Sequence, residues 1–208
     1  MQVLRRALAA YITQPIVDLL AKTAVTPNMV TWFGFVLILV AAALAAMGYP
    51  FAAGWVVLLS GLTDIIDGAL ARRTNKVTKF GGVLDSTLDR LSEAAILIGI
   101  MAFFLFHAGS AWFRWITLLI GLTLIFSFLV SYIRSRAEAT GINCQVGVFT
   151  RAERVIILAL GLLINIDLAL VVALAIIALL SLITVIQRLL YVYQQARDKS
   201  DDLGKENR

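Results

Sequence analysis

The chain has 208 residues, of which 61% are apolar and only 15% charged, and its mean hydropathy is +0.91. A soluble domain is about 45–50% apolar and about 25% charged, so this composition excludes an ordinary water-soluble domain; it also excludes a disordered chain. The net charge of +5 fits either nucleic acid or anionic lipid, and the high hydropathy favours lipid. We therefore expect a membrane-lipid environment and no nucleic-acid partner. Cys144 is the one cysteine, so an internal disulfide is impossible.

The first 27 residues form a basic amphipathic stretch. Apolar residues recur at helical spacing from Val3 to Leu20, and charged residues such as Arg5 and Asp18 interrupt them. This pattern predicts an interfacial helix that lies on the cytoplasmic leaflet. The alternative is a plain packing helix that extends the first membrane span.

The apolar segments that follow predict an all-α integral membrane protein with six transmembrane helices. No charged residue occurs between Lys22 and Asp64, a stretch long enough for two spans of about 20 residues, and the turn at Gly48-Tyr49-Pro50 divides it. The expected spans lie near residues 28–48, 52–71, 83–106, 112–135, 152–166 and 168–190. The chain is thus divided into a juxtamembrane segment (1–27), a membrane domain (28–195) and a polar, frayed tail (196–208).

The basic residues predict the orientation of these spans. With the N-terminus in the cytoplasm, every Lys and Arg except Arg114 lies in or beside a cytoplasmic segment, which is a strong positive-inside pattern. Trp55, Trp112 and Trp115 fall near the opposite boundary, as an aromatic belt does. We expect a multi-pass protein of the cell membrane with both termini in the cytoplasm.

Five carboxylates lie where a membrane helix rarely carries charge. They are Asp64 and Asp67, three residues apart, and Asp85, Asp89 and Glu93, at steps of four. Each set shares one helix face, and the short connection between the two helices predicts antiparallel neighbours whose acidic faces meet. Carboxylates gathered in low dielectric repel one another unless a cation lies among them, and oxygen ligands favour magnesium or manganese.

Two other interpretations of these acids stay open. The carboxylates can fasten the helices through ion pairs with neighbouring arginines, namely Arg72, Arg73 and Arg90. Glu93 lies one turn deeper than the others, so it is equally compatible with a contact that locks two helices together.

The aspartates belong to a longer pattern of fixed spacing. Its eight residues are Asp64, Asp67, Gly68, Ala71, Arg72, Gly81, Asp85 and Asp89. Every position and gap resembles the signature of the CDP-alcohol phosphotransferases, a family with six membrane spans and an amphipathic N-terminal helix. The resemblance implies that a CDP-linked lipid such as CDP-diacylglycerol gives its phosphatidyl group to an alcohol and releases CMP, a step of phospholipid biosynthesis.

The resemblance also implies roles for individual residues. Two magnesium ions, or manganese in their place, would be held by Asp64, Asp67, Asp85 and Asp89. Asp89 would in addition take the proton of the acceptor hydroxyl. The nucleotide pocket would be formed by Gly68, Ala71, Arg72 and Gly81, with Thr31 as a further candidate. The active site would face the cytoplasm, and the family pattern implies a homodimer.

A second basic cluster predicts how the acceptor is bound. Three arginines at the ends of three spans can hold a phosphate: Arg134, Arg151 and Arg188. Lipid headgroups, or Glu138 and Glu153, are their alternative partners. The segments 131–138 and 151–154 resemble the phosphatidylinositol-phosphate synthase branch, which implies inositol 1-phosphate as the acceptor.

Two alternatives to this function remain. The nearest is the same chemistry on glycerol 3-phosphate, as in a phosphatidylglycerophosphate synthase, because the same arginines would serve. A divalent-cation transporter is the alternative of a different class, since transporters also need acids within their spans. The carboxylates lie near the cytoplasmic ends of their helices rather than at the midplane, which argues against transport.

Overall fold

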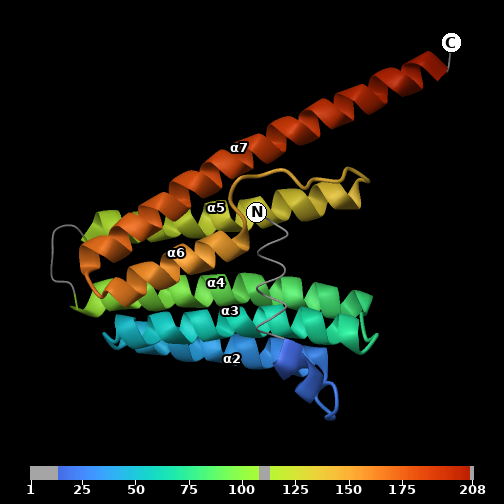
Figure 1. Cartoon of the computed structure of the whole chain (residues 1–208). Helices are drawn as coiled ribbons and strands as arrows, with labels where there is room; N and C mark the ends of the chain where they lie inside the picture. Colours follow the sequence, from blue (N-terminus) through green and yellow to red (C-terminus); the bar gives the residue numbers. More distant parts are fainter. Residues whose placement is uncertain (1–13, 108–112, 207–208) are drawn as a thin grey trace. The chain divides into compact units, whose positions relative to one another are not determined.

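The computed structural model describes residues 14–107 and 113–206, and all regular structure in these ranges is helical (Figure 1). The helices are α2 (Pro27–Ala46), α3 (Pro50–Arg73), α4 (Lys79–His107), α5 (Phe113–Ala139), α6 (Arg151–Ile164) and α7 (Asp167–Glu206). The chain divides into two compact units, Met1–Gly109 and Ser110–Arg208, and each is described by itself. The positions of the six apolar segments along the chain are thus confirmed as helices.

The first unit is built on α2, which packs closely along both α3 and α4. Thr26 caps α2 through its hydroxyl, which accepts the Met29 N–H at 3.4 Å, and Pro27 occupies the first turn, where its missing N–H costs nothing. Gly48 has a φ of 86°, and Pro50 begins α3, so the predicted turn between the first two spans is confirmed.

The closest packing between α2 and α4 depends on a glycine. A Cβ placed on Gly99 would lie 2.4 Å from the carbonyl oxygen of Ala42 and 2.8 Å from its Cα, so only hydrogen fits between the two backbones. Small residues at helix crossings are the usual means of close approach between membrane helices. Gly99 therefore sets the distance between α2 and α4 and, through them, the geometry of the unit.

Replacing Gly99 with alanine is expected to destabilise the protein by about 1–3 kcal/mol. The added methyl group overpacks a filled helix contact, and this costs more than the higher helix propensity of alanine contributes. Thermal unfolding in detergent micelles measures the effect. Gly121→Ala is the matched control, since a Cβ on Gly121 meets nothing within 4 Å and stability should be unchanged or slightly raised. A Gly99→Ala protein as stable as the unmodified chain would contradict this account.

In the second unit, α7 packs against both α5 and α6. Asn165 ends α6 in the left-handed conformation, with a φ of 56°, and α7 begins at Asp167, so the chain turns between the predicted spans 152–166 and 168–190. The hydroxyl of Thr123 on α5 lies 3.3 Å from the Leu174 carbonyl oxygen on α7, and Ser127 and Ser181 are fully buried on the same two helices. Small polar residues thus line the contact between α5 and α7.

Within residues 14–107 and 113–206, four helices are long and apolar enough to cross a membrane: α2, α3, α5 and the part of α7 from Asp167 to Arg197. Many of their large apolar side chains are exposed, which is costly in water and expected in lipid. With 14 residues, α6 is about 21 Å long and falls short of a hydrocarbon core of about 30 Å. The architecture fits an integral membrane protein, and six spans remain a prediction.

The structure can be compared with the predictions for the two ends of the chain, the amphipathic N-terminal segment and the polar C-terminal tail. Of the predicted amphipathic segment, residues 1–13 lie outside the described ranges, while 14–20 are helical and Val17 is 4% exposed against Val30, Ile66 and Leu70. The fraying of the tail stays a prediction, and its backbone continues α7 as far as Glu206. The tail carries no proline, and its first glycine is Gly204, so nothing stops the helix earlier.

Candidate active site

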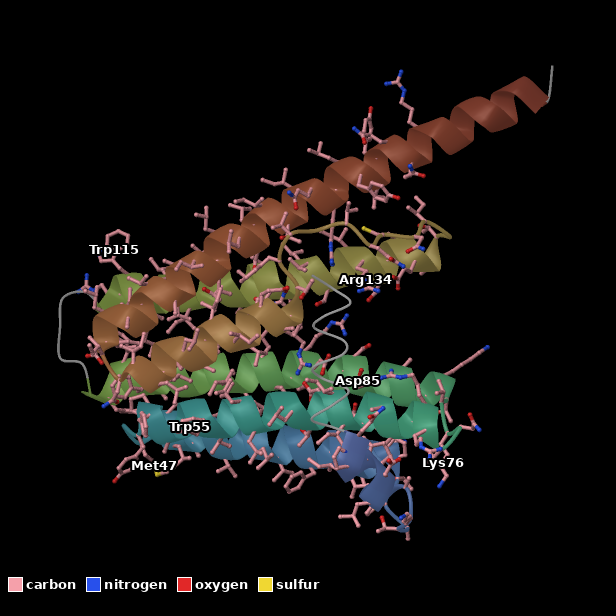
Figure 2. The ribbon with its side chains drawn as sticks, in the orientation of Figure 1. Met47, Trp55, Lys76, Asp85, Trp115 and Arg134 are labelled. Carbon is pink, nitrogen blue, oxygen red and sulfur yellow. The ribbon has the colours of Figure 1, made fainter. Side chains whose placement is uncertain are left out.

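A cavity of about 330 Å³ lies at the end of the first unit where α3 ends and α4 begins. It is lined by Pro27, Asn28 and Thr31 of α2, by Asp67, Gly68, Ala71 and Arg72 of α3, by Lys76, Val77 and Thr78 of the connection, and by Gly81, Gly82 and Asp85 of α4. Figure 2 shows Asp85 toward the end of this unit that carries Lys76, with Met47 and Trp55 toward the other end. Asp85 thus lies away from the end of the unit that carries Trp55, as the sequence predicts.

The connection between α3 and α4 is a tight turn closed by hydrogen bonds at both helix ends. Asn75 adopts a left-handed φ of 53°, and the N–H of Lys76 donates to the Ala71 carbonyl at 3.0 Å, which is the bond pattern of a Schellman motif. Thr78 then accepts the Gly81 N–H through its hydroxyl at 2.9 Å and caps α4. The turn reverses the chain, so α3 and α4 are antiparallel, as expected.

The cavity opens where α3 ends and α4 begins, beside the first turns of α2. In the described part of this unit α2 packs closely along both α3 and α4, and the expected meeting of the acidic faces of α3 and α4 stays a prediction. A Cβ on Gly81 would lie 2.9 Å from Thr78 Oγ1 and 3.3 Å from Asn28 Oδ1, while one on Gly82 would meet nothing within 4 Å. Gly82 thus faces open space, whereas a side chain at Gly81 would press on Thr78 and on Asn28 of α2.

Asp67 is the most buried acid at this cavity, with 6% of its surface exposed. The hydroxyl of Thr31 donates to its Oδ2 at 2.7 Å, a bond between α2 and α3 that fixes the carboxylate. The negative charges of Asp64 and Asp85 also act on Asp67. Thr31 was predicted to approach the nucleotide, and in this structure it lines the cavity and holds Asp67.

The motif residues predicted for the nucleotide pocket lie together on this cavity: Thr31, Gly68, Ala71, Arg72 and Gly81. A Cβ on Gly68 would lie 3.4 Å from Arg72 Nη1, so the absence of a side chain there leaves room for the guanidinium. Arg72 is exposed, which keeps its N–H donors available to an anion at the mouth of the cavity.

The four motif aspartates are distributed around the cavity rather than gathered in it. Asp67 and Asp85 line it, whereas Asp64 and Asp89 are half-buried beside it, with Asp89 one turn after Asp85 on α4. In the described ranges no three carboxylate, imidazole or thiol groups stand close enough to hold a metal ion. The donor set nevertheless fits magnesium or manganese, because it consists of hard carboxylate oxygens on two helices around an open space.

Several lining residues lay outside the predicted pocket, among them three residues of the α3–α4 connection: Lys76, Val77 and Thr78. The sequence feature that could have identified these residues is their position in the short connection between the two halves of the motif. Asn28 also lines the cavity, through its position in the first turn of α2. Lys76 adds a second positive charge, besides that of Arg72, to a lining that also holds Asp67 and Asp85.

The predicted acceptor arginines belong to the second unit. Arg188 is only 5% exposed; its Nε donates to the Val146 carbonyl at 2.9 Å, and its Nη1 donates to the Val130 carbonyl. Arg134 pairs with Glu138 at 2.9 Å, so the alternative partner named for it is the one observed. Both side chains of that pair are about half exposed, and exposed pairs are weak enough to exchange partners.

Arg151 and Arg154 lie at the start of α6. The Glu153 carboxylate accepts the N–H of Thr150 at 2.7 Å and closes the helix end, so Glu153 acts as a cap. Arg154 is 2% exposed, and its positive charge acts on Arg188, as does that of Arg134. Arg154 was not predicted as a site residue, although its spacing of three from Arg151 places both on one face of the helix.

The chain was compared with known proteins. A model of the CDP-alcohol phosphatidyltransferase family matches residues 24–191. The archaetidylinositol phosphate synthase of Methanothermobacter thermautotrophicus is 40% identical over 191 residues, which cover 88% of this chain and 89% of the relative.

Two crystal structures of the Mycobacterium tuberculosis phosphatidylinositol phosphate synthase are also similar. The one with CDP-DAG bound has a TM-score of 0.81 and 36% identity, covering 88% of this chain and 94% of that chain. The one in complex with manganese and citrate has a TM-score of 0.80 and 36% identity, covering 87% and 88%.

The helical fold and the acidic cavity, together with these likenesses, define a membrane-bound transferase of phospholipid biosynthesis. The chain belongs to the CDP-alcohol phosphatidyltransferase family. It is therefore an enzyme. Membership of this family favours a transferase over the divalent-cation transporter, which the acidic residues of the helices alone left as an alternative.

Proposed function

We propose that this enzyme transfers the phosphatidyl group of a CDP-linked lipid to inositol 1-phosphate and releases CMP. The observation that carries the donor half is the cavity at the α3–α4 turn, where Thr31 holds Asp67 and five predicted nucleotide-pocket residues meet. The choice of inositol 1-phosphate as the acceptor is supported by the names of the similar proteins, which each specify a lipid product that carries inositol phosphate.

In the cavity proposed to bind the CDP-linked lipid, the charge of each residue determines which part of the donor it would bind. Arg72 at the mouth is suited to a phosphate oxygen, while Gly68 and Gly81 leave room for a flat nucleotide. The metal ligands would be Asp64, Asp67, Asp85 and Asp89, which would hold two magnesium ions, or manganese in their place. When bound, the metal offsets the negative charge of the diphosphate. Manganese in the tuberculosis structure supports a divalent cation.

In the transfer itself, Asp89 takes the proton of the acceptor hydroxyl as that oxygen attacks the lipid-bearing phosphorus. The new bond joins the acceptor oxygen to this phosphorus, and the bond from the phosphorus to the bridging oxygen of the diphosphate breaks. CMP leaves with the electron pair of the broken bond. The half-buried position of Asp89 keeps its carboxylate within reach of a proton from water-soluble substrate.

The phosphate of the acceptor would be bound by Arg134, Arg151 and Arg188. The two carbonyl bonds of Arg188 use two of its five N–H groups, so three remain for a phosphate. The surrounding positive charge of Arg134 and Arg154 favours an anion at this point, since like charges are relieved by a counter-ion.

The membrane arrangement follows from charge. We propose six spans, with both termini and the active site on the cytoplasmic side, where a water-soluble acceptor meets a lipid donor. The protein is proposed to act as a homodimer, in keeping with the family.

An acceptor panel tests this proposal. Purified enzyme is given CDP-diacylglycerol or its isoprenoid ether counterpart with magnesium, and CMP release is measured with inositol 1-phosphate, glycerol 3-phosphate and free inositol. We expect release with inositol 1-phosphate alone. Release with glycerol 3-phosphate and not with inositol 1-phosphate would overturn the acceptor and favour a phosphatidylglycerophosphate synthase. The two donors are compared because the similar proteins differ in whether their names specify an archaetidyl or a phosphatidyl product.

A further inference from the structure

The segment that joins α5 to α6 lies against α7 and is bonded to it. Ile142, Cys144 and Phe149 of this segment are buried, so it is part of the packed interior of the second unit. The Val146 carbonyl accepts from Arg188, and the N–H of Val148 donates to the side-chain oxygen of Gln187 at 3.3 Å. Two neighbouring residues of α7 thus bond to the two sides of Gly147.

Gly147 lies beside the Thr184 and Arg188 side chains, with no room for a side chain of its own. Its φ is +134°, a conformation that L side chains rarely adopt. A Cβ at this position would lie 2.7 Å from Thr184 Cγ2, 3.3 Å from Arg188 Nε and 3.5 Å from Arg188 Nη2. The bare backbone of Gly147 therefore lies where any side chain would press on the guanidinium.

The guanidinium of Arg188 is fixed on both sides by backbone groups. The carbonyl oxygens of Val130 on α5 and of Val146 in the connecting segment each accept a hydrogen bond from this guanidinium. A planar guanidinium with two bonds in fixed directions has little freedom to rotate, so its remaining N–H groups have set directions. The connecting segment, held by Gln187, supplies one of these two fixed points.

We propose that Gly147 and Gln187 are positioning residues for acceptor binding: together they hold the 146–148 backbone so that Arg188 presents its remaining N–H groups to the phosphate of the acceptor. This rests on the proposed function, because it takes Arg188 as a ligand of that phosphate. Neither residue touches the donor cavity, which is formed by residues of the first unit.

The test compares Gly147→Ala with Gly141→Ala in the full-length enzyme. Gly141 also has a positive φ, of 76°, so both substitutions impose backbone strain in the same connecting segment. We expect Gly147→Ala to raise the KM for inositol 1-phosphate by about tenfold or more, because a small displacement of a binding group is costly. The KM for the CDP-lipid should stay within about twofold, and Gly141→Ala should change neither KM beyond that.

Gln187→Leu provides a second variant with less strain, in case Gly147→Ala does not fold. It removes the acceptor of the Val148 N–H while keeping the size of the side chain, and we expect the acceptor KM to rise by about fivefold. Thermal unfolding confirms that each variant is folded. The double variant Gly147→Ala/Arg188→Ala should have the same acceptor KM as Arg188→Ala alone, since the proposed effect passes through Arg188.

The outcomes separate this inference from the function on which it rests. If Arg188→Ala raises the acceptor KM but folded Gly147→Ala and Gln187→Leu do not, the positioning role is wrong and the proposed function stands. If Arg188→Ala leaves the acceptor KM unchanged, Arg188 does not bind the acceptor, and both the role of Arg188 and the inference fail. If the KM for the CDP-lipid rises as much as that for the acceptor, the effect is a general disturbance and the inference is overturned.

Discussion

Replacing Asp89 with asparagine is expected to lower kcat by about a hundredfold to ten-thousandfold, the usual contribution of a general base. Asparagine matches aspartate in size but does not take a proton at neutral pH, so the acceptor hydroxyl keeps its hydrogen. The KM for the CDP-lipid should change far less, because Asp89 does not line the cavity assigned to the nucleotide. Steady-state CMP release measures both constants.

Asp18→Asn is the matched control for this substitution. Asp18 is an exposed carboxylate of the same unit and pairs with Arg73 at 3.2 Å, away from the motif. An exposed pair contributes little, so stability and kcat should be unchanged. Near-normal turnover of Asp89→Asn would remove Asp89 from its role as the base.

Replacing Asp67 with asparagine is expected to abolish most activity and to raise the manganese concentration for half-maximal activity by at least about tenfold. The amide oxygen of asparagine can still accept the Thr31 hydroxyl, so the contact between α2 and α3 is retained while the negative charge is lost. A manganese titration of CMP release, together with direct manganese binding to the purified protein, measures the change.

Thr31→Val separates the charge of Asp67 from its orientation. This variant keeps the carboxylate and removes its hydrogen bond, which is worth about 1.5–3 kcal/mol when one partner is charged. We expect a smaller loss of activity and a smaller shift of the manganese midpoint than in Asp67→Asn. Equal manganese binding by Asp67→Asn and the unmodified protein would show that Asp67 is not a metal ligand.

Much of the first unit could be predicted from local sequence. Thr26 and Pro27 mark the start of one helix, and Gly48 and Pro50 mark the turn to the next, because caps and turns depend on residues near one another in the chain. The spacing of the aspartates within each helix also follows from the helical repeat. These features require no knowledge of how helices pack.

What could not be predicted depends on the register between helices. The hydroxyl of Thr31 reaches Asp67 only because α2 and α3 pack at one particular offset, and the Ala42–Gly99 contact sets a similar offset for α4. The periodicity of an apolar helix shows which face is buried and not how far it slides along its neighbour. For the same reason the sequence predicted a phosphate, a lipid headgroup or a glutamate as the partner of Arg188, whereas the structure shows its guanidinium bonded to two backbone carbonyls.

The lone cysteine has a practical value for testing the membrane arrangement. Cys144 is fully buried against Ala137 and Ile142, so its thiol is shielded from a bulky, water-soluble maleimide. The chain is therefore close to a natural cysteine-free background for labelling. Single cysteines introduced at exposed positions such as Lys22 and Tyr49 can be probed from either side of sealed vesicles without first removing a native thiol.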